Sequence, residues 1–137
     1  MSIERKLPGY MTEDLTLRIV AGPASYQAFT DKPVEYITVA NQRDDVLAYV
    51  YANDEDDVVA WLSRPAAGLE GHNTYYPWMM RLRELKARGV PPSAALDELV
   101  RAGTDTPVNP RSHVVPNSRQ RAASLAALEV IARAPGQ

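Results

Sequence analysis

The first half of the chain alternates apolar and polar residues in short runs, which predicts strands. Residues 15–20 (Leu-Thr-Leu-Arg-Ile-Val) alternate at a period of two, as expected of a strand with one buried face. Residues 34–40 and 46–52 are rich in β-branched and aromatic side chains, which are typical of strands. Residues 26–29 are a weaker candidate. Because connections this short join neighbouring antiparallel strands, the pattern predicts an antiparallel meander.

An acidic cluster at residues 53–57 (Asn-Asp-Glu-Asp-Asp) separates residues 46–52 from the apolar residues 58–62. Asp and Asn favour turns because their side chains accept hydrogen bonds from nearby backbone amides. The β-branched pair Val58-Val59 then favours a strand over a helix that begins in the cluster. A calcium loop would need alternating ligands and a glycine at its bend, and the cluster has neither. We therefore expect a solvent-facing turn whose charges contribute little to stability, with weak cation binding as the alternative.

The second half changes to the period of an α-helix. In residues 75–89 the apolar positions recur at the spacing of one buried helix face: Tyr75, Trp78, Met79, Leu82 and Leu85. Asn73 or Thr74 can cap this helix, and Gly89 suits its C-terminal end. This is the clearest helix in the sequence. Trp61, Trp78 and Leu82 are expected to be largely buried.

Two further helices are predicted towards the C-terminus. One follows Pro91-Pro92, and the other begins at Asn117, which with Gln120 resembles a capping box. The residues expected on their buried sides are Leu96, Leu99 and Val100 in the first, and Leu125, Leu128 and Ile131 in the second. The proline-rich connection at 104–117 is unusually long for a compact domain, which suggests a functional loop, a strap across the fold or a tether.

These patterns predict an α+β fold in which an N-terminal antiparallel sheet of four or five strands packs against about three C-terminal helices. A chain of 137 residues fits a single domain that buries roughly two-thirds of the surface its unfolded chain exposes. Within 1–137 we expect residues 12–64 to be mainly β, residues 73–134 to be mainly α and residues 1–11 to be flexible.

The composition excludes several kinds of chemistry. Cysteine is absent, which excludes thiol catalysis, disulfides and cysteine-ligated metal sites and favours a reducing compartment. No segment approaches the roughly 20 apolar residues of a membrane span, and the start has no apolar signal region, so we expect a cytoplasmic protein. Arginine far outnumbers lysine and alanine is abundant, a bias associated with GC-rich bacterial genomes.

Charge is unevenly distributed. Residues 1–64 contain six Lys and Arg against eleven Asp and Glu, whereas residues 65–137 contain nine against six, for a net charge of −2. The basic side chains that could meet phosphates are Arg81, Arg83, Lys86, Arg88, Arg111, Arg119 and Arg121. A sequence pI of about 5.7 and the acidic first half argue against a nucleic-acid partner, which requires concentrated positive potential.

Candidate catalytic residues are few. His72 and His113 can titrate near neutrality and act as acid or base. Their spacing matches no zinc motif, and the chain has no nucleophile elbow, Walker A loop or dinucleotide fingerprint. We therefore expect no metal and no cofactor. A small hydrolase or ligand-binding enzyme that pairs one of these histidines with a carboxylate is the alternative to a protein without catalytic activity.

The group of aromatic and methionine residues at 75–80 exceeds what one buried helix face needs. Tyr76 and Met80 fall at the edge of the buried stripe, next to Arg81 and Arg83. Such side chains are enriched at protein interfaces. The sequence therefore favours a non-catalytic protein-binding or regulatory module with these four residues as its binding surface, and with a protein partner or a second copy of the chain as its ligand.

Overall fold

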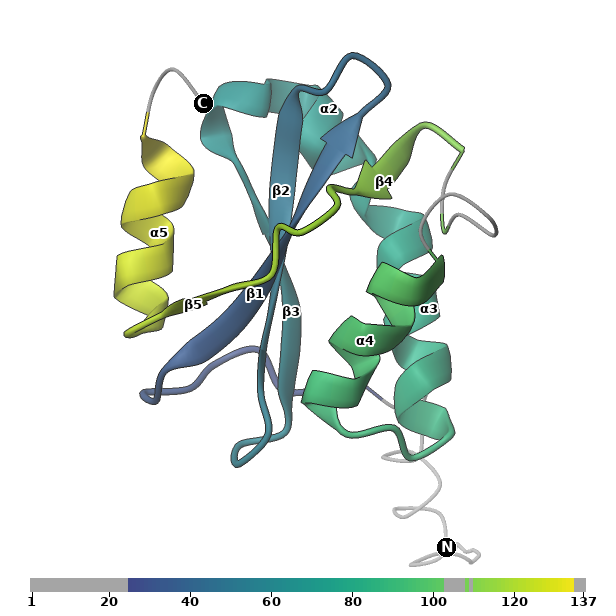
Figure 1. The fold of residues 1–137 in the computed structure, drawn as a ribbon, viewed down its shortest axis with the longest axis vertical. Helices are drawn as coiled ribbons and strands as arrows, with labels where there is room; N and C mark the ends of the chain where they lie inside the picture. Colours follow the sequence, from purple (N-terminus) through teal and green to yellow (C-terminus); the bar gives the residue numbers. More distant parts are fainter. Residues whose placement is uncertain (1–24, 103–107, 109, 135–137) are drawn as a thin grey trace, which may run out of the picture.

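The structure, a computed structural model, describes residues 25–102, 108 and 110–134. The flexible segment expected at 1–11 and the strand expected at 15–20 lie outside the described residues. The described part is an α+β arrangement in which an antiparallel sheet lies between two helical layers. Figure 1 shows α5 on one face of the sheet and α3 with α4 on the other.

Within the described part of the chain five strands form the sheet, in the order β3-β2-β1-β4, with β5 also paired to β1. Their bounds are Val34–Asn41 (β1), Val46–Asn53 (β2), Val58–Ser63 (β3), Ser112–Val114 (β4) and Gln120–Ala122 (β5). The meander of β1, β2 and β3 confirms the strands predicted at 34–40, 46–52 and 58–62. The weaker candidate at 26–29 is not a strand, since it makes only an isolated bridge from Gln27 to Val58. The short β4 and β5 share one edge of β1, β4 beside residues 39–41 and β5 beside residues 34–36.

The capping box predicted at Asn117 and Gln120 is wrong. Asn117 has a φ of 60°, a left-handed conformation rather than the extended one of an N-cap, and Gln120 belongs to β5. The Gln120 side chain accepts a 3.2 Å hydrogen bond from the Tyr36 hydroxyl. The last helix begins later, where the Ser124 hydroxyl oxygen accepts a 3.0 Å hydrogen bond from the Ala127 amide.

In the described residues four α-helices accompany the sheet: α2 (Gly68–Asn73), α3 (Tyr75–Ala87), α4 (Pro92–Ala102) and α5 (Leu125–Arg133). The predicted helices at α3 and α4 are confirmed, and Gly89, with a φ of 76°, follows the end of α3 as expected. The unexpected α2 leads directly into α3. Thr74 therefore has helical backbone angles and makes no side-chain capping bond, contrary to prediction.

Two apolar clusters fill the spaces on either side of the sheet. Between the sheet and α3 with α4 lie Ile37, Val39, Val50, Trp78, Leu82, Leu85, Leu96 and Leu99. Between the sheet and α5 lie Val34, Tyr36, Tyr49, Val58, Leu128 and Ala132. The expected burial of Trp78 and Leu82 is confirmed, whereas Trp61 is only half-buried and Val100 is exposed. Among the described residues, none of the helices is long and apolar enough to cross a membrane.

Candidate functional site

A hollow of about 340 Å³ opens between α3 and the outer edge of β3. Its walls are mostly aromatic and apolar, and they come from three parts of the chain: the segment before β1, the strands β2 and β3, and the helix α3. The residues used below are Tyr26, Tyr51, Trp61, Tyr75, Met79 and Arg83. Apolar walls with a few polar groups are the usual composition of a ligand site.

The spacing of α3 turns one stripe of side chains towards the hollow. Tyr75, Met79 and Arg83 are four residues apart, so they lie one above another on the helix. Tyr75 is 37% exposed, and Met79 is half-buried. Both positions differ from the expectation that they face the core. Trp61 lies next to this stripe, with its ring centroid 6.0 Å from that of Tyr75 and 5.9 Å from that of Trp78.

Two tyrosines anchor the opposite wall. The Tyr26 hydroxyl donates a 2.6 Å hydrogen bond to the carbonyl oxygen of Val90, and burial is the main reason why the pKa of Tyr26 is raised to about 12. The Tyr51 hydroxyl donates a 2.7 Å hydrogen bond to the carbonyl oxygen of Ala28. These bonds tie the segment before β1 to the rest of the fold. The wall is therefore held in place without a ligand.

Arg83 places a positive charge at this apolar hollow. Its Nε is buried without a hydrogen-bond partner, and within the described part of the chain no carboxylate lies within ion-pair distance of its guanidinium. The neighbouring basic residues of α3 differ: Arg81 pairs with Glu84 at 3.2 Å, and Lys86 pairs with Asp57. A guanidinium with unused donors favours a planar anion such as a carboxylate.

The outer edge of β3 is paired only at its beginning in the described structure. The Gln27 amide donates a 2.8 Å hydrogen bond to the Asp57 carbonyl, and the Val59 amide donates a 3.2 Å bond to the Gln27 carbonyl. Because backbone groups alternate in direction along a strand, those of Trp61 and Ser63 also point outwards. Among the described residues they have no backbone partner. This leaves an open strand edge beside the hollow.

The four residues predicted to bind a partner do not lie on one stripe of α3. Tyr76 and Met80, four residues apart, are 62% and 43% exposed and form an outward stripe. Arg83 belongs to the stripe that lines the hollow. Arg81 is engaged by Glu84, so it is not a free rim residue. The sequence had no signal for the position of Arg83 or for the contribution of Trp61, because both depend on how β3 lies against α3.

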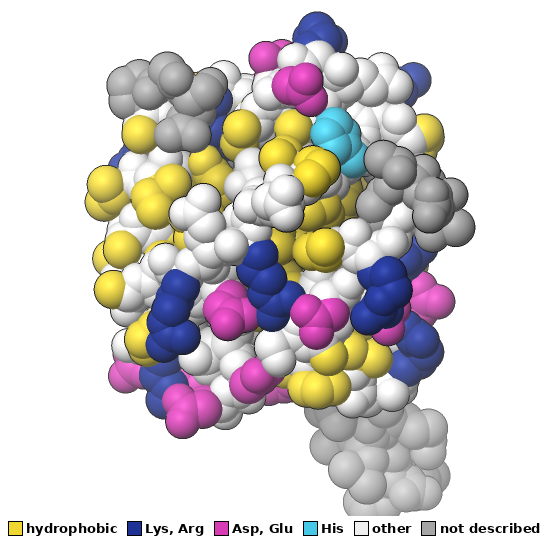
Figure 2. Space-filling view, viewed as in Figure 1, with side chains coloured by type: hydrophobic (Ala, Val, Ile, Leu, Met, Phe, Trp, Pro, Cys, Tyr) yellow, Lys and Arg dark blue, Asp and Glu magenta, His cyan; other side chains and the backbone are white. Residues whose placement is uncertain are grey.

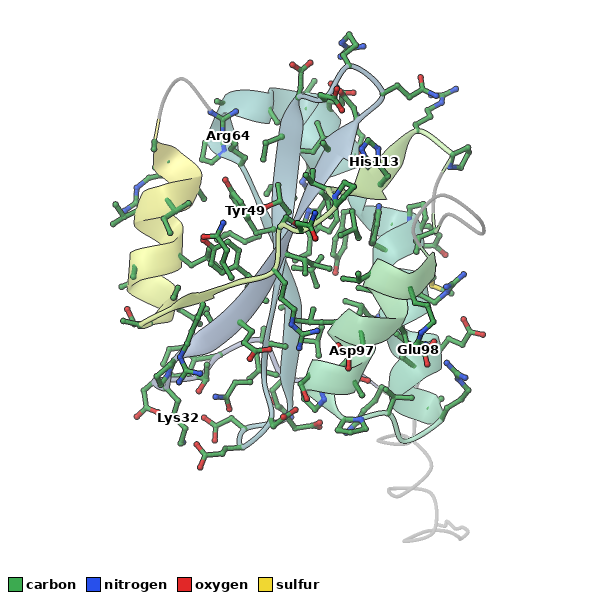
Figure 3. The ribbon with its side chains drawn as sticks, in the orientation of Figure 1. Lys32, Tyr49, Arg64, Asp97, Glu98 and His113 are labelled. Carbon is green, nitrogen blue, oxygen red and sulfur yellow. The ribbon has the colours of Figure 1, made fainter. Side chains whose placement is uncertain are left out.

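The two candidate catalytic histidines lie elsewhere. His72 is exposed in α2. His113 is on β4 (Figure 3), and its Nε2 lies 3.9 Å from Oδ1 of the exposed Asp44, which is too long for a hydrogen bond. Neither histidine lines the hollow beside α3. The structure therefore does not join a histidine and a carboxylate into an acid–base pair at this hollow.

Asn53 ends β2, and residues 54–57 form a turn followed by a strand, as predicted, but the side chains of 53–57 make more hydrogen bonds and ion pairs than expected. The Asn53 side chain accepts a 2.8 Å hydrogen bond from the Asp56 amide, and Asp57 has a φ of 56°. Asp54, Asp56 and Asp57 then reach different partners: Ser93, Thr30 with Lys32, and Lys86 respectively. Within the described residues no group of three or more His, Asp or Glu could hold a metal ion.

Arg64 is buried as a whole residue, whereas Arg83 is half-buried, and the Arg64 Nε likewise has no hydrogen-bond partner. Arg64 is 7% exposed, and its Nη2 donates a 3.2 Å hydrogen bond to the carbonyl oxygen of Ala134, at the end of α5. Figure 3 shows it between α5 and the top of the sheet, near Tyr49. A cation at a helix C-terminus is favoured by the helix dipole. Arg64 therefore supports the packing of α5 through its Nη2, and unlike Arg83 it does not line the hollow beside α3.

Basic side chains elsewhere lie next to acidic ones. Arg119 pairs with Glu35 and with Asp97. On the face shown in Figure 2, dark-blue and magenta side chains are interspersed in one band below a more apolar region.

Within the described residues, the hollow beside α3 combines three features: apolar walls, an unpaired guanidinium and an open strand edge. Comparison of the chain with protein-family models, with curated proteins and with solved structures gave no match.

Proposed function

We propose that this chain is a non-catalytic protein-binding or regulatory module whose binding surface is the exposed side of α3. One observation supports this most directly: Tyr76 is 62% exposed and Met80 43% exposed on one stripe of a helix whose other side is buried. Tyr and Met are both enriched at protein interfaces, and Tyr is also enriched among the residues that carry most of the binding energy. The helix also holds them in fixed relative positions.

The ligand proposed for this surface is a protein, either a partner or a second copy of the chain. A nucleic acid is disfavoured because Arg81, Lys86 and Arg119 are paired with carboxylates, which reduces the positive potential they could present. The absence of cysteine supports a reducing compartment such as the cytoplasm, and the excess of arginine over lysine together with the abundant alanine supports a bacterial source.

A site-specific photo-cross-linker tests the proposal. Benzoylphenylalanine is placed at Tyr76 and, as a matched control, at Val130, which is 61% exposed on α5 in the opposite helical layer. After illumination in the source cell, the cross-linked protein is identified and purified. Its affinity is then measured by calorimetry for the wild-type chain and for the double variant Tyr76→Ala, Met80→Ala.

We expect an adduct at position 76 that is absent at position 130, and a double variant that binds at least roughly 30-fold more weakly, as for loss of an interface anchor worth about 2 kcal/mol. Thermal melts should change little because both side chains are at the surface, outside the apolar core. Sedimentation over a range of concentrations distinguishes a partner from self-association. Equal affinities of the wild type and the double variant would remove α3 as the binding surface.

A further inference from the structure

We infer that the protein ligand is an extended segment of a partner that adds a strand to the free edge of β3, with an apolar side chain in the hollow and a carboxylate on Arg83. This inference rests on the proposed protein-binding function and specifies its ligand. Three features of the described structure lead to it: the unpaired edge, the shape and lining of the hollow, and the unpaired guanidinium.

The backbone of β3 provides the docking edge. Its outward N–H and C=O groups are used by Gln27 only beside Val58, and those of Trp61 and Ser63 have no backbone partner in the described residues. An unpaired strand edge accepts an extended peptide through main-chain hydrogen bonds. A short added strand could therefore pair with Trp61 and Ser63, beyond the part of β3 that pairs with Gln27.

The hollow provides a pocket for a side chain of that added strand. It begins at the same edge, because Val59, Ala60 and Trp61 contribute to its lining, and it extends to Tyr75 and Met79 on α3. An apolar side chain placed there would leave water and contact mostly aromatic and apolar atoms. In strand addition the main chain gives affinity, and such pockets give specificity.

Arg83 selects the charge of the ligand. Its guanidinium lines the same hollow, and its Nε is buried without a partner. A carboxylate from the ligand would supply charge-assisted hydrogen bonds to this group. Alternate residues of a strand lie on the same face, about 7 Å apart. The expected ligand pattern is therefore an apolar residue and an acidic residue separated by one residue.

The same argument favours a partner over a second copy of the chain at this edge. Two β3 strands paired edge to edge would present Val58–Ser63, VVAWLS, to each other. That strand contains no acidic residue, so self-pairing would leave Arg83 without a carboxylate from the added strand. Charge complementarity at the hollow thus requires a different sequence.

A designed peptide tests the inference with the full-length chain. The probe is a fluorescein-labelled, C-terminally amidated hexapeptide, Thr-Leu-Thr-Glu-Thr-Thr, whose affinity is measured by fluorescence anisotropy. Two control peptides replace Glu by Gln or methylate the backbone nitrogens that would pair with the edge. The protein variants are Arg83→Gln and, as a matched control on the same helix, Arg81→Gln, with thermal melts to verify folding.

We expect the wild type to bind the Glu peptide about tenfold more tightly than the Gln peptide, as for one charge-assisted contact. Arg83→Gln should bind both peptides equally, Arg81→Gln should retain the preference, and the N-methylated peptide should bind at least tenfold more weakly. Amide hydrogen exchange at Trp61 and Ser63 should slow when the Glu peptide is bound. The preference and the slowed exchange together would support the ligand and its register.

Equal binding of the Glu and Gln peptides to the wild type, or no binding at millimolar peptide, would overturn the inference. So would amides of Trp61 and Ser63 that are already protected in the free chain. If these amides are protected from hydrogen exchange equally at all protein concentrations, the edge of β3 is paired within the same chain. If their protection rises with protein concentration, the edge is paired with a second copy. The cross-linking result at Tyr76 is independent of these outcomes, so failure of the strand-addition inference and failure of the binding function are distinguishable.

Discussion

Asp54 caps a helix that lies far from it in sequence: its carboxylate accepts two hydrogen bonds from Ser93, from the backbone amide to Oδ1 and from the hydroxyl to Oδ2, each 2.8 Å long. Ser93 is the second residue of α4, so its amide has no acceptor within the helix. A negative charge at this end is also favoured by the helix dipole. The acidic turn between β2 and β3 is therefore joined to α4.

Replacing Asp54 by Ala should destabilise the protein by about 1 kcal/mol, the usual cost of losing a helix N-cap. Urea unfolding at neutral pH measures this difference. Glu55→Gln is the control, because Glu55 is an exposed neighbour in the same turn and surface substitutions usually change stability by less than about 0.5 kcal/mol. If Asp54→Ala lowers the free energy of unfolding no more than Glu55→Gln does, the bonds from Asp54 to Ser93 do not stabilise the fold.

Asp56 makes stability depend on pH in the acid range. The Thr30 hydroxyl donates a 2.5 Å hydrogen bond and Lys32 donates two of 3.0 Å, and these bonds hold the pKa of Asp56 below its ordinary value of 3.8, with the Thr30 bond the larger cause. The unfolded chain therefore binds the proton at higher pH than the folded chain does. The stabilisation by the carboxylate is complete above the unfolded pKa and is lost as pH falls through the lower, folded pKa.

At pH 7 the urea concentration at the unfolding midpoint should therefore be higher for the wild type than for Asp56→Asn. The difference between the two midpoints should shrink from about pH 4 downwards. Unfolding curves of both proteins at a series of pH values measure it. Thr30→Val should show the same trend, because it removes the bond that lowers the pKa most. A difference that is constant from pH 7 to pH 2 would mean that the carboxylate has no lowered pKa.

Regular patterns allowed much of the central sheet and α3 to be predicted. β1 and β2 are eight residues long and rich in β-branched and aromatic side chains, and α3 extends over thirteen residues with Trp78, Leu82 and Leu85 buried. β4 and β5 have only three residues each, too few to establish a period. They are defined by pairing with β1, which is information that the local sequence does not contain. Near Asn117 that pairing overrides the local signal for a helix cap.

The site was predictable only in part. The exposed positions of Tyr76 and Met80 follow from the helical period, since they fall between the buried residues of α3. The hollow instead depends on the parallel contact of Gln27 with β3 and on how β3 lies against α3. The sequence placed Arg83 on the same binding surface as Tyr76 and Met80, whereas in the structure it lines the hollow and its Nε is buried.

Trp78 joins α3 to β4 through a buried hydrogen bond, since its indole Nε1 donates to the Ser112 hydroxyl oxygen at 2.9 Å. Ser112→Ala should cost about 1 to 3 kcal/mol because it leaves the buried donor unpaired. Trp78→Phe removes the donor, so adding Ser112→Ala to it should cost much less. Urea unfolding of the wild type, the two single variants and the double variant completes the double-mutant cycle. If the two changes in free energy of unfolding simply add, the bond contributes little.

Gly71 allows α2 to approach β2 closely. A Cβ at this position would lie 2.8 Å from the carbonyl oxygen of Leu47 and 3.1 Å from the Ala67 Cβ. The Leu47 oxygen belongs to the backbone of β2 and already accepts a 2.8 Å hydrogen bond from the Arg64 amide, so it cannot withdraw without disturbing the sheet. Helix propensity alone would favour alanine over glycine by about 1 kcal/mol. Overpacking of this kind costs about 1 to 3 kcal/mol.

Gly71→Ala should therefore destabilise the protein despite the better helix propensity, and urea unfolding gives the sign directly. Amide exchange at Arg64 should become faster, because the bond to Leu47 would have to lengthen. Ala67→Gly, added to Gly71→Ala, removes the 3.1 Å contact but not the 2.8 Å one. The double variant should thus recover little stability if the contact with the strand backbone dominates. A stabilising Gly71→Ala would show that α2 can move away from β2 at small cost.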